Sequence, residues 1–137
     1  MRVQLVINRG LDGKFKKITE SLENYGEIYA TKMAAQLVLA SPVDTGTFMD
    51  NFYAGGSGTV GSTSSQGKPR NQPWNGQDAI NRMSQGIAAL RGSTTMLFGN
   101  TADHAYEVEY DHGYAPFGKA ANMHGRLARE AWAEAGL

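Results

Sequence analysis

The stretch that decides the fold runs from residue 12 to residue 48 and reads DGKFKKITESLENYGEIYATKMAAQLVLASPVDTGTF. Apolar residues recur in it at spacings of three and four, the period of one face of an α-helix. These residues are Phe15, Ile18, Leu22, Tyr25, Tyr29, Met33 and Leu37. The pattern predicts a long amphipathic helix over residues 12–40, with Asp12 as its N-cap. Pro42 ends the helix, because the residue before a proline is disfavoured in the α region.

A compact turn with the sequence SPVDTG follows this helix. Within it Asp44 can form an Asx turn, Thr45 can add a hydroxyl hydrogen bond, and Gly46 can adopt a positive φ. Such a turn directs the chain sharply from the helix into a strand, which we expect over residues 48–53. The residues assigned to this structural turn are Ser41, Pro42, Asp44, Thr45 and Gly46.

The rest of the chain alternates shorter strand and helix patterns. Residues 101–110 fit either a helix or a strand, and a stretch punctuated by Gly and Pro follows at 111–118. This order predicts an α+β fold in a single domain, residues 1–137, with the long helix and further helices packed on a small, mostly antiparallel sheet. The other expected elements are strands over 2–8 and 94–98 and helices over 78–92 and 123–135.

Residues 55–76 differ in composition from the rest of the chain. They contain six glycines and two prolines, and their only charged residues are Lys68 and Arg70. A structureless segment of this length is uncommon inside a compact domain and is usually functional or disordered. We expect a long Gly/Ser-rich loop or arm that is mobile in the free subunit and becomes ordered against a partner, with Trp74 as the anchor at its base. Its cations could face DNA or a neighbouring subunit.

Composition narrows the function classes. Thirteen Lys and Arg balance thirteen Asp and Glu, so the formal net charge is zero. Neutrality argues against a protein that holds nucleic acid mainly by counterion release. The absence of cysteine excludes disulfides and thiolate metal sites. No secretion signal is visible, and no apolar run approaches the ~20 residues that span a bilayer. We therefore expect no membrane partner and assembly in a cytoplasm.

A polar cluster between residues 103 and 112 is the most enzyme-like feature. If this segment were helical, His104 and Glu107 would be neighbours, but no arrangement matches a recognised metal-ligand spacing. We therefore expect no catalytic, metal or cofactor-binding residues and no enzymatic activity. Two alternatives stay open: a small metal-dependent hydrolase, and a nucleic-acid-binding module that uses the loop 55–76. The hydrolase would use Glu107, Glu109, Asp111 and His112.

Several short motifs follow one another in a characteristic order. SPVDTGTF at 41–48 ends a long helix, FGN at 98–100 ends a β-prone segment, and YEVEY at 106–110 precedes APFG at 115–118. Their order and distances resemble the neck and tail-completion proteins of long-tailed bacteriophages, including the family of the lambda-like tail-completion protein Z. The resemblance covers about residues 40–120. In this chain the Tyr-Ala of the family pattern is reversed, as Ala105-Tyr106, and the Glu-x-Gly element is longer.

The resemblance implies a structural role and no chemistry. Such proteins form a homomeric ring, expected here to be six-fold, in the virion neck around the channel through which DNA passes without sequence-specific binding. The implied partners are other copies of the chain, a head connector or adaptor protein, and a tail terminator or tail-tube protein. Glu109 could pair with a basic group on its own subunit or on the next. The motif and interface candidates are Asn100, Tyr106, Glu109, Tyr110, Ala115, Pro116 and Gly118.

Overall fold

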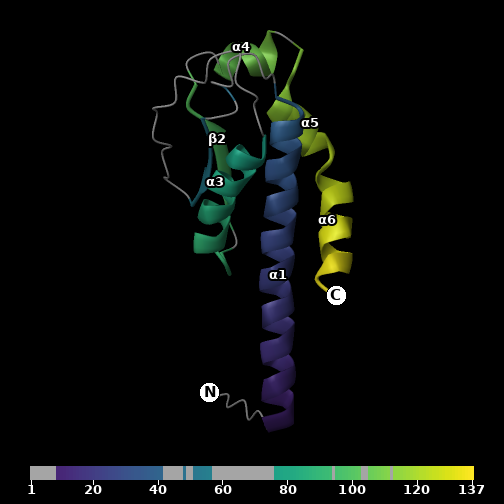
Figure 1. Cartoon of the computed structure of the whole chain (residues 1–137). Coiled ribbons are helices and arrows are strands. Elements are labelled where there is room, and N and C mark those ends of the chain that lie inside the picture. The colour runs from purple at the N-terminus through teal and green to yellow at the C-terminus, as the bar shows by residue number, and fades with distance from the viewer. Residues whose placement is uncertain are drawn as a thin grey trace, which may run out of the picture.

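The computed structural model describes residues 9–41, 48, 51–56, 76–93, 95–102, 105–111 and 113–137. Its longest element is helix α1, Arg9–Leu39, which has 31 residues. This confirms the long helix expected from the apolar period. The helix begins three residues before Asp12, so the N-cap assigned to Asp12 is wrong. At ~1.5 Å per residue such a helix is roughly 46 Å long, and it extends along the whole molecule (Figure 1).

Two short strands and further helices make up the rest of the described chain. They are β1 (Phe52–Gly55), α3 (Gly76–Ala89), β2 (Leu97–Asn100), α4 (Ala105–Tyr110), α5 (Pro116–Asn122) and α6 (His124–Glu134). The strands pair antiparallel, with Phe52 opposite Asn100 and Gly55 opposite Leu97. The chain is therefore an α+β protein with a small antiparallel sheet, as the sequence predicts.

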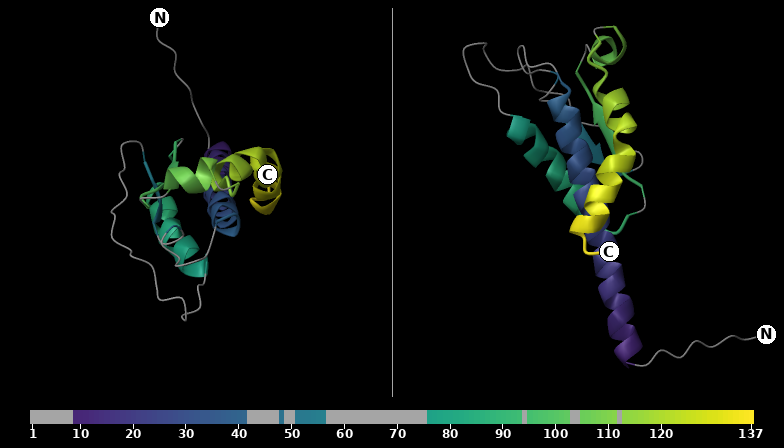
Figure 2. Two further views of the ribbon diagram at one scale, coloured as in Figure 1. Left: turned by 90° about the horizontal axis from the view of Figure 1, so that it is seen from above. Right: turned by 90° about the vertical axis from the view of Figure 1, so that its right-hand side faces the viewer.

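Helix α1 separates two layers of other elements. Helix α3 and the two strands lie along one side of its C-terminal half, whereas α5 and α6 lie along the other side (Figures 1 and 2). The N-terminal part of α1 extends beyond all of them. The molecule thus has a packed end, where α1 finishes, and a projecting end, where α1 begins.

The core lies between α1, α3 and the sheet. Its largest fully buried side chains include Leu37, Phe48, Phe52, Met83 and Ile87. Helix α3 approaches the sheet closely at Gly86, where an added Cβ would collide with the backbone carbonyl oxygen of Ala54. Glycine is required there because only a hydrogen atom fits between this helix and β1.

The strand expected over residues 48–53 begins later than predicted. Phe48 is helical, and its carbonyl oxygen accepts a hydrogen bond from the Asn51 amide at 3.2 Å. This turn keeps Phe48 in the core and delays strand pairing to Phe52. Strand β2 is shifted in the same direction, from the expected 94–98 to Leu97–Asn100, because its register is fixed by β1.

The C-terminal third is more helical than predicted. The ambiguous segment 101–110 forms α4 at Ala105–Tyr110, and the stretch with Gly and Pro contains the start of α5. Pro116 opens that helix, a position where its missing N–H costs nothing. The strand expected at 2–8, turn residues 42–47 and loop residues 57–75 lie outside the described residues, as do Lys68, Arg70 and Trp74.

Candidate functional site

The site begins where α1 ends. The Ser41 hydroxyl donates a hydrogen bond of 2.6 Å to the Leu37 carbonyl oxygen, and the Ser41 amide donates one of 3.1 Å to Val38. Ser41 is buried, so these bonds satisfy polar groups that would otherwise be costly inside the protein. Ser41 therefore takes part in the end of α1. The remaining turn residues Pro42, Asp44, Thr45 and Gly46 lie outside the described part of the chain.

Asn100, at the end of β2, joins two segments that are distant in sequence. Its side-chain Nδ2 donates a hydrogen bond of 2.6 Å to the carbonyl oxygen of Phe48, which is 52 residues earlier. Its Oδ1 accepts one of 2.9 Å from the amide of Ala102. Beside it, the Thr101 amide bonds to the Asn51 carbonyl oxygen at 3.1 Å. The side-chain amide of Asn100 thus uses its donor to hold the chain after α1 against the end of β2, and its acceptor to fix the chain that leads to α4.

Glu109, near the end of α4, binds the first turn of α5. Its carboxylate accepts hydrogen bonds from the amides of Phe117, at 3.0 Å, and Gly118, at 2.9 Å. The first amides of a helix lack partners within the helix, and the N-terminal end of its dipole attracts negative charge. Ala115 occupies the N-cap position without a side chain that could accept these bonds. The described partners of Glu109 are therefore backbone amides, whereas the sequence suggested a basic group.

Ala115 and Gly118 shape the start of α5 in two different ways. Ala115 has φ of 40° and ψ of 55°, a left-handed conformation that turns the chain sharply into α5. A Cβ on Gly118 would lie 3.4 Å from the Oε1 atom of Glu109. Pro116 between them is fully buried. The APFG segment is thus a tight helix start that receives a carboxylate from α4.

Aromatic packing connects these two hydrogen-bonded points. The ring of Phe48 meets that of Phe52 edge-on, with centroids 5.1 Å apart. Phe52 in turn packs against Phe117 of the APFG segment at 5.8 Å. The described residues of the segments that carry the resemblance therefore meet at the packed end of the molecule, where α1 finishes.

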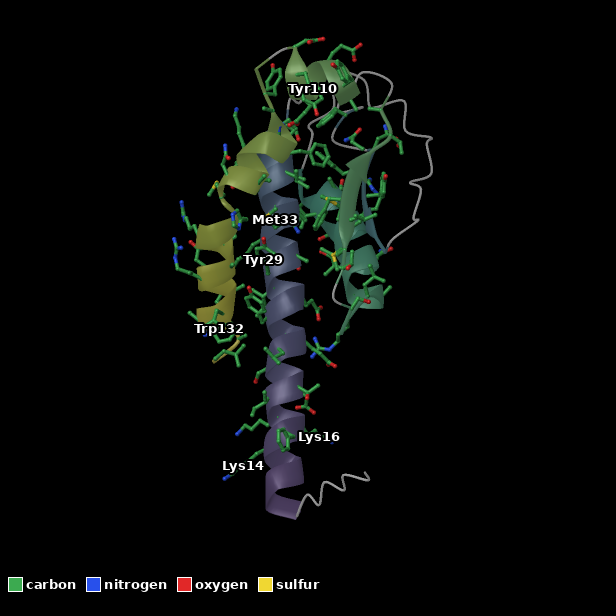
Figure 3. All side chains as sticks on the ribbon, turned by 180° about the vertical axis from the view of Figure 1, so that it is seen from behind. Lys14, Lys16, Tyr29, Met33, Tyr110 and Trp132 are labelled. Atoms are coloured by element: carbon green, nitrogen blue, oxygen red, sulfur yellow. The ribbon has the colours of Figure 1, made fainter. Side chains whose placement is uncertain are left out.

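Two other candidates, Tyr106 and Tyr110, face outward. Their exposed fractions are 67% and 70%, and their ring centroids lie 4.7 Å apart. Figure 3 shows Tyr110 on α4 at the extreme of the packed end. Glu107 and Asp111 are exposed on the same segment. This end of the molecule therefore presents two exposed aromatic rings, tilted at 43° to each other, with acidic neighbours.

The enzyme-like cluster is not brought together in the described chain. Glu109 is engaged with α5, Glu107 is exposed, and Asp103, His104 and His112 lie outside the described residues. Among the residues that can be described, no group of three or more His, Cys, Asp or Glu side chains could hold a metal ion. Of the four residues of the hydrolase alternative, the described Glu107, Glu109 and Asp111 therefore do not form a metal site.

Sequence reasoning missed two ion-pair networks that fix other elements to α1. Arg91, after α3, contacts Glu27 at 2.7 Å and Glu23 at 3.3 Å. On the other side, Lys32 contacts Glu134 of α6 at 2.8 Å, and this hydrogen bond is the main cause that raises the pKa of Lys32 above its usual 10.5. The sequence did show glutamates four residues apart on the polar face of α1, which indicates that this face can form ion pairs. It contained no indication of which cations would pair with them.

Comparisons with protein families, with curated proteins and with solved structures find no significant match to this chain. Within the described residues, no helix combines the length and the apolar character needed to cross a membrane. The case for a function therefore depends on the sequence motifs and on the geometry described above.

Proposed function

We propose that this chain is a structural subunit of the virion neck of a long-tailed bacteriophage. Identical copies form a ring, expected to be six-fold, that completes the tail and joins it to the head connector around the DNA channel. The observation that carries the proposal is that the described residues of the segments resembling tail-completion proteins meet at one end of the molecule. Asn100 holds the segment at Phe48 by a hydrogen bond to its carbonyl oxygen, and Glu109 holds the APFG segment by hydrogen bonds from its amides.

The roles of these polar groups favour a structural protein. The side chains of Asn100 and Glu109 form hydrogen bonds with backbone atoms of their own chain, and these bonds shape a surface. The exposed pair Tyr106 and Tyr110 supplies what such a surface needs, since tyrosine is enriched at protein interfaces. We assign this pair to contact with the adjoining neck protein, either a head connector or adaptor or a tail terminator or tail-tube protein.

In this role the chain catalyses no reaction and needs no cofactor. DNA passes through the lumen of the ring without sequence-specific contacts, which agrees with the zero net charge of the chain. Assembly takes place in the host cytoplasm, and the finished protein resides in the virion.

The proposal is tested by deleting the gene from the phage that carries it. We expect the deletion to yield filled heads and separate tails in electron micrographs, and purified protein added to such a lysate to restore joined particles. Tyr106→Ala combined with Tyr110→Ala should fail to restore joining while remaining folded, because both rings are exposed. Glu107→Ala, an exposed position on the same helix, is the matched control and should restore it. Normal virions without this protein would refute the proposal.

A further inference from the structure

The projecting end of α1 carries an apolar stripe. Phe15, Ile18 and Leu22 lie on one face of the helix and are 50%, 52% and 47% exposed. Figure 1 shows this part of α1 extending beyond α3 and α6. Large apolar side chains gathered on an exposed face are typical of an interaction surface, because their contact with water is unfavourable.

A groove begins where this stripe reaches the body of the molecule. It lies between α1, the end of α3 and the segment that leads into β2, and its volume is about 670 Å³. Leu22 belongs both to the stripe and to the groove, so the two form one continuous apolar surface. The apolar lining residues include Leu22, Tyr29, Met33, Ile87, Met96 and Phe98.

The spacing along α1 favours a helix as the occupant of the groove. The apolar positions of the stripe and of the groove wall alternate intervals of three and four residues, the pattern by which one helix packs along another. They are Phe15, Ile18, Leu22, Tyr25 and Tyr29.

Gly26 lies in this wall, and the described part of its own chain does not require a glycine there. An added Cβ there would meet nothing within 4 Å, although glycine destabilises the interior of a helix. The missing side chain leaves room for a second helix to approach α1 closely.

Charge indicates which helix fits. Lys14 and Lys16 project from the helix around the start of the stripe (Figure 3), and Lys14, Lys16 and Lys17 are all exposed. The groove contains the carboxylates of Glu23 and Glu27 against the single cation Arg91, and Arg91 is already bound to both. The projecting end is therefore basic and the groove is acidic, a complementarity that fixes orientation and partner choice.

We propose that the projecting tip of α1, residues 14–18, seats in the groove of a second copy of this chain. The tip cannot fill its own groove, because α1 is one continuous helix from Arg9 to Leu39. Tip and groove are different patches, so the contact is heterologous, the kind that generates closed rings. This inference rests on the proposed ring and deepens it by naming the surfaces that join its subunits.

Cysteine cross-linking tests the contact, because the native chain has no cysteine. In the double variant Phe15→Cys with Met96→Cys, a mild oxidant should link each subunit to two neighbours. We expect a ladder of disulfide-linked species larger than the dimer, ending at the size of the ring. The control places the second cysteine at Gln85, which is exposed on α3 outside the groove, and should give at least tenfold less cross-linking. Failure to cross-link, or a product that stops at the dimer, overturns the proposal; the latter would indicate two-fold pairing of α1 helices.

A second variant separates assembly from folding. Gly26→Leu should leave the melting temperature of the monomer unchanged or higher, since an added Cβ meets no described atom within 4 Å and leucine is a better helix former than glycine. The same variant should lose most of the assembly seen by native mass spectrometry, because the new side chain blocks the groove. Rings that persist in Gly26→Leu would refute the tip-to-groove contact while leaving the ring itself intact. Normal head–tail joining by a variant that forms no ring would instead count against the proposed function.

Discussion

Glu109 and Gly118 are nine residues apart and are joined by a hydrogen bond of 2.9 Å from the Gly118 amide to the Glu109 carboxylate. This bond does for α5 what an N-cap side chain usually does, since an N-cap oxygen accepts from the second or third amide of its helix. Ala115 cannot provide that oxygen, so α4 supplies it instead. Two motif segments that look independent in the sequence thus form one capping unit.

Replacing Glu109 with Ala should destabilise the protein by about 1–2 kcal/mol, the usual cost of removing a helix cap. Glu109→Gln should lose less, because one amide oxygen can still accept a bond from Phe117 or Gly118. Chemical denaturation followed by circular dichroism measures both. Glu107→Ala on the exposed face of α4 is the control and should stay within about 0.5 kcal/mol of the native protein. Equal stability of Glu109→Ala and Glu107→Ala would contradict the capping role.

Replacing Asn100 should destabilise the protein more than replacing Glu109. Asn100→Ala removes the donor to the Phe48 carbonyl oxygen and the acceptor for the Ala102 amide, at a cost of about 1–3 kcal/mol for groups left without partners. Asn100→Asp keeps the acceptor but places an oxygen against the Phe48 carbonyl, so we expect it to rescue little of the loss. Urea unfolding of the three proteins provides the measurement. If Asn100→Asp were as stable as the native protein, the bond to Phe48 would contribute nothing.

The sequence predicted what depends on periodicity and missed what depends on distant contacts. The apolar spacing from Phe15 to Leu37 located α1 within a few residues, because one face of a long helix imposes a regular pattern. The predicted start of β1 was wrong because the turn between Phe48 and Asn51 depends on Asn100, which lies far away in sequence.

The candidate site shows the same division. The motifs indicated that Asn100, Glu109 and the APFG segment matter. They could not indicate that Asn100 binds the Phe48 carbonyl oxygen or that Glu109 binds backbone amides of the APFG segment. Helix α5 was unexpected because a seven-residue helix is too short to give a periodic signal, and its start depends on a carboxylate from α4. The partners of Arg91 and Lys32 could not be predicted either, because the residues next to a charged residue in the sequence do not indicate which distant residue it will contact.

Two helical glycines should respond oppositely to alanine. Gly86→Ala drives a Cβ into the Ala54 carbonyl oxygen, a backbone atom that cannot rotate away, so we expect a loss of at least about 1–3 kcal/mol. Gly26→Ala has open space around it and should stabilise the helix by up to about 1 kcal/mol. Thermal melts at a concentration where the protein is monomeric compare the two. A stabilised Gly86→Ala would mean that α3 does not contact β1 as described.

The link between α1 and α6 should weaken at both ends of the pH range. The hydrogen bond from Lys32 to Glu134 raises the pKa of Lys32, so its stabilisation is complete below its usual pKa of 10.5 and is lost as the pH rises through the raised value. Glu130 has a lowered pKa, chiefly through its hydrogen bond to Arg126 within α6 and to a smaller extent through Lys32 of α1. The stabilisation from Glu130 is present above its usual pKa of 4.5 and is lost as the pH falls through the lowered value, and the part due to Lys32 is the acid-sensitive part of the link. Lys32→Met should therefore show a small deficit in melting temperature near neutral pH that shrinks toward both extremes, because the native protein then loses the same contacts. A deficit that stays constant across the pH range would show that Lys32 acts through packing alone.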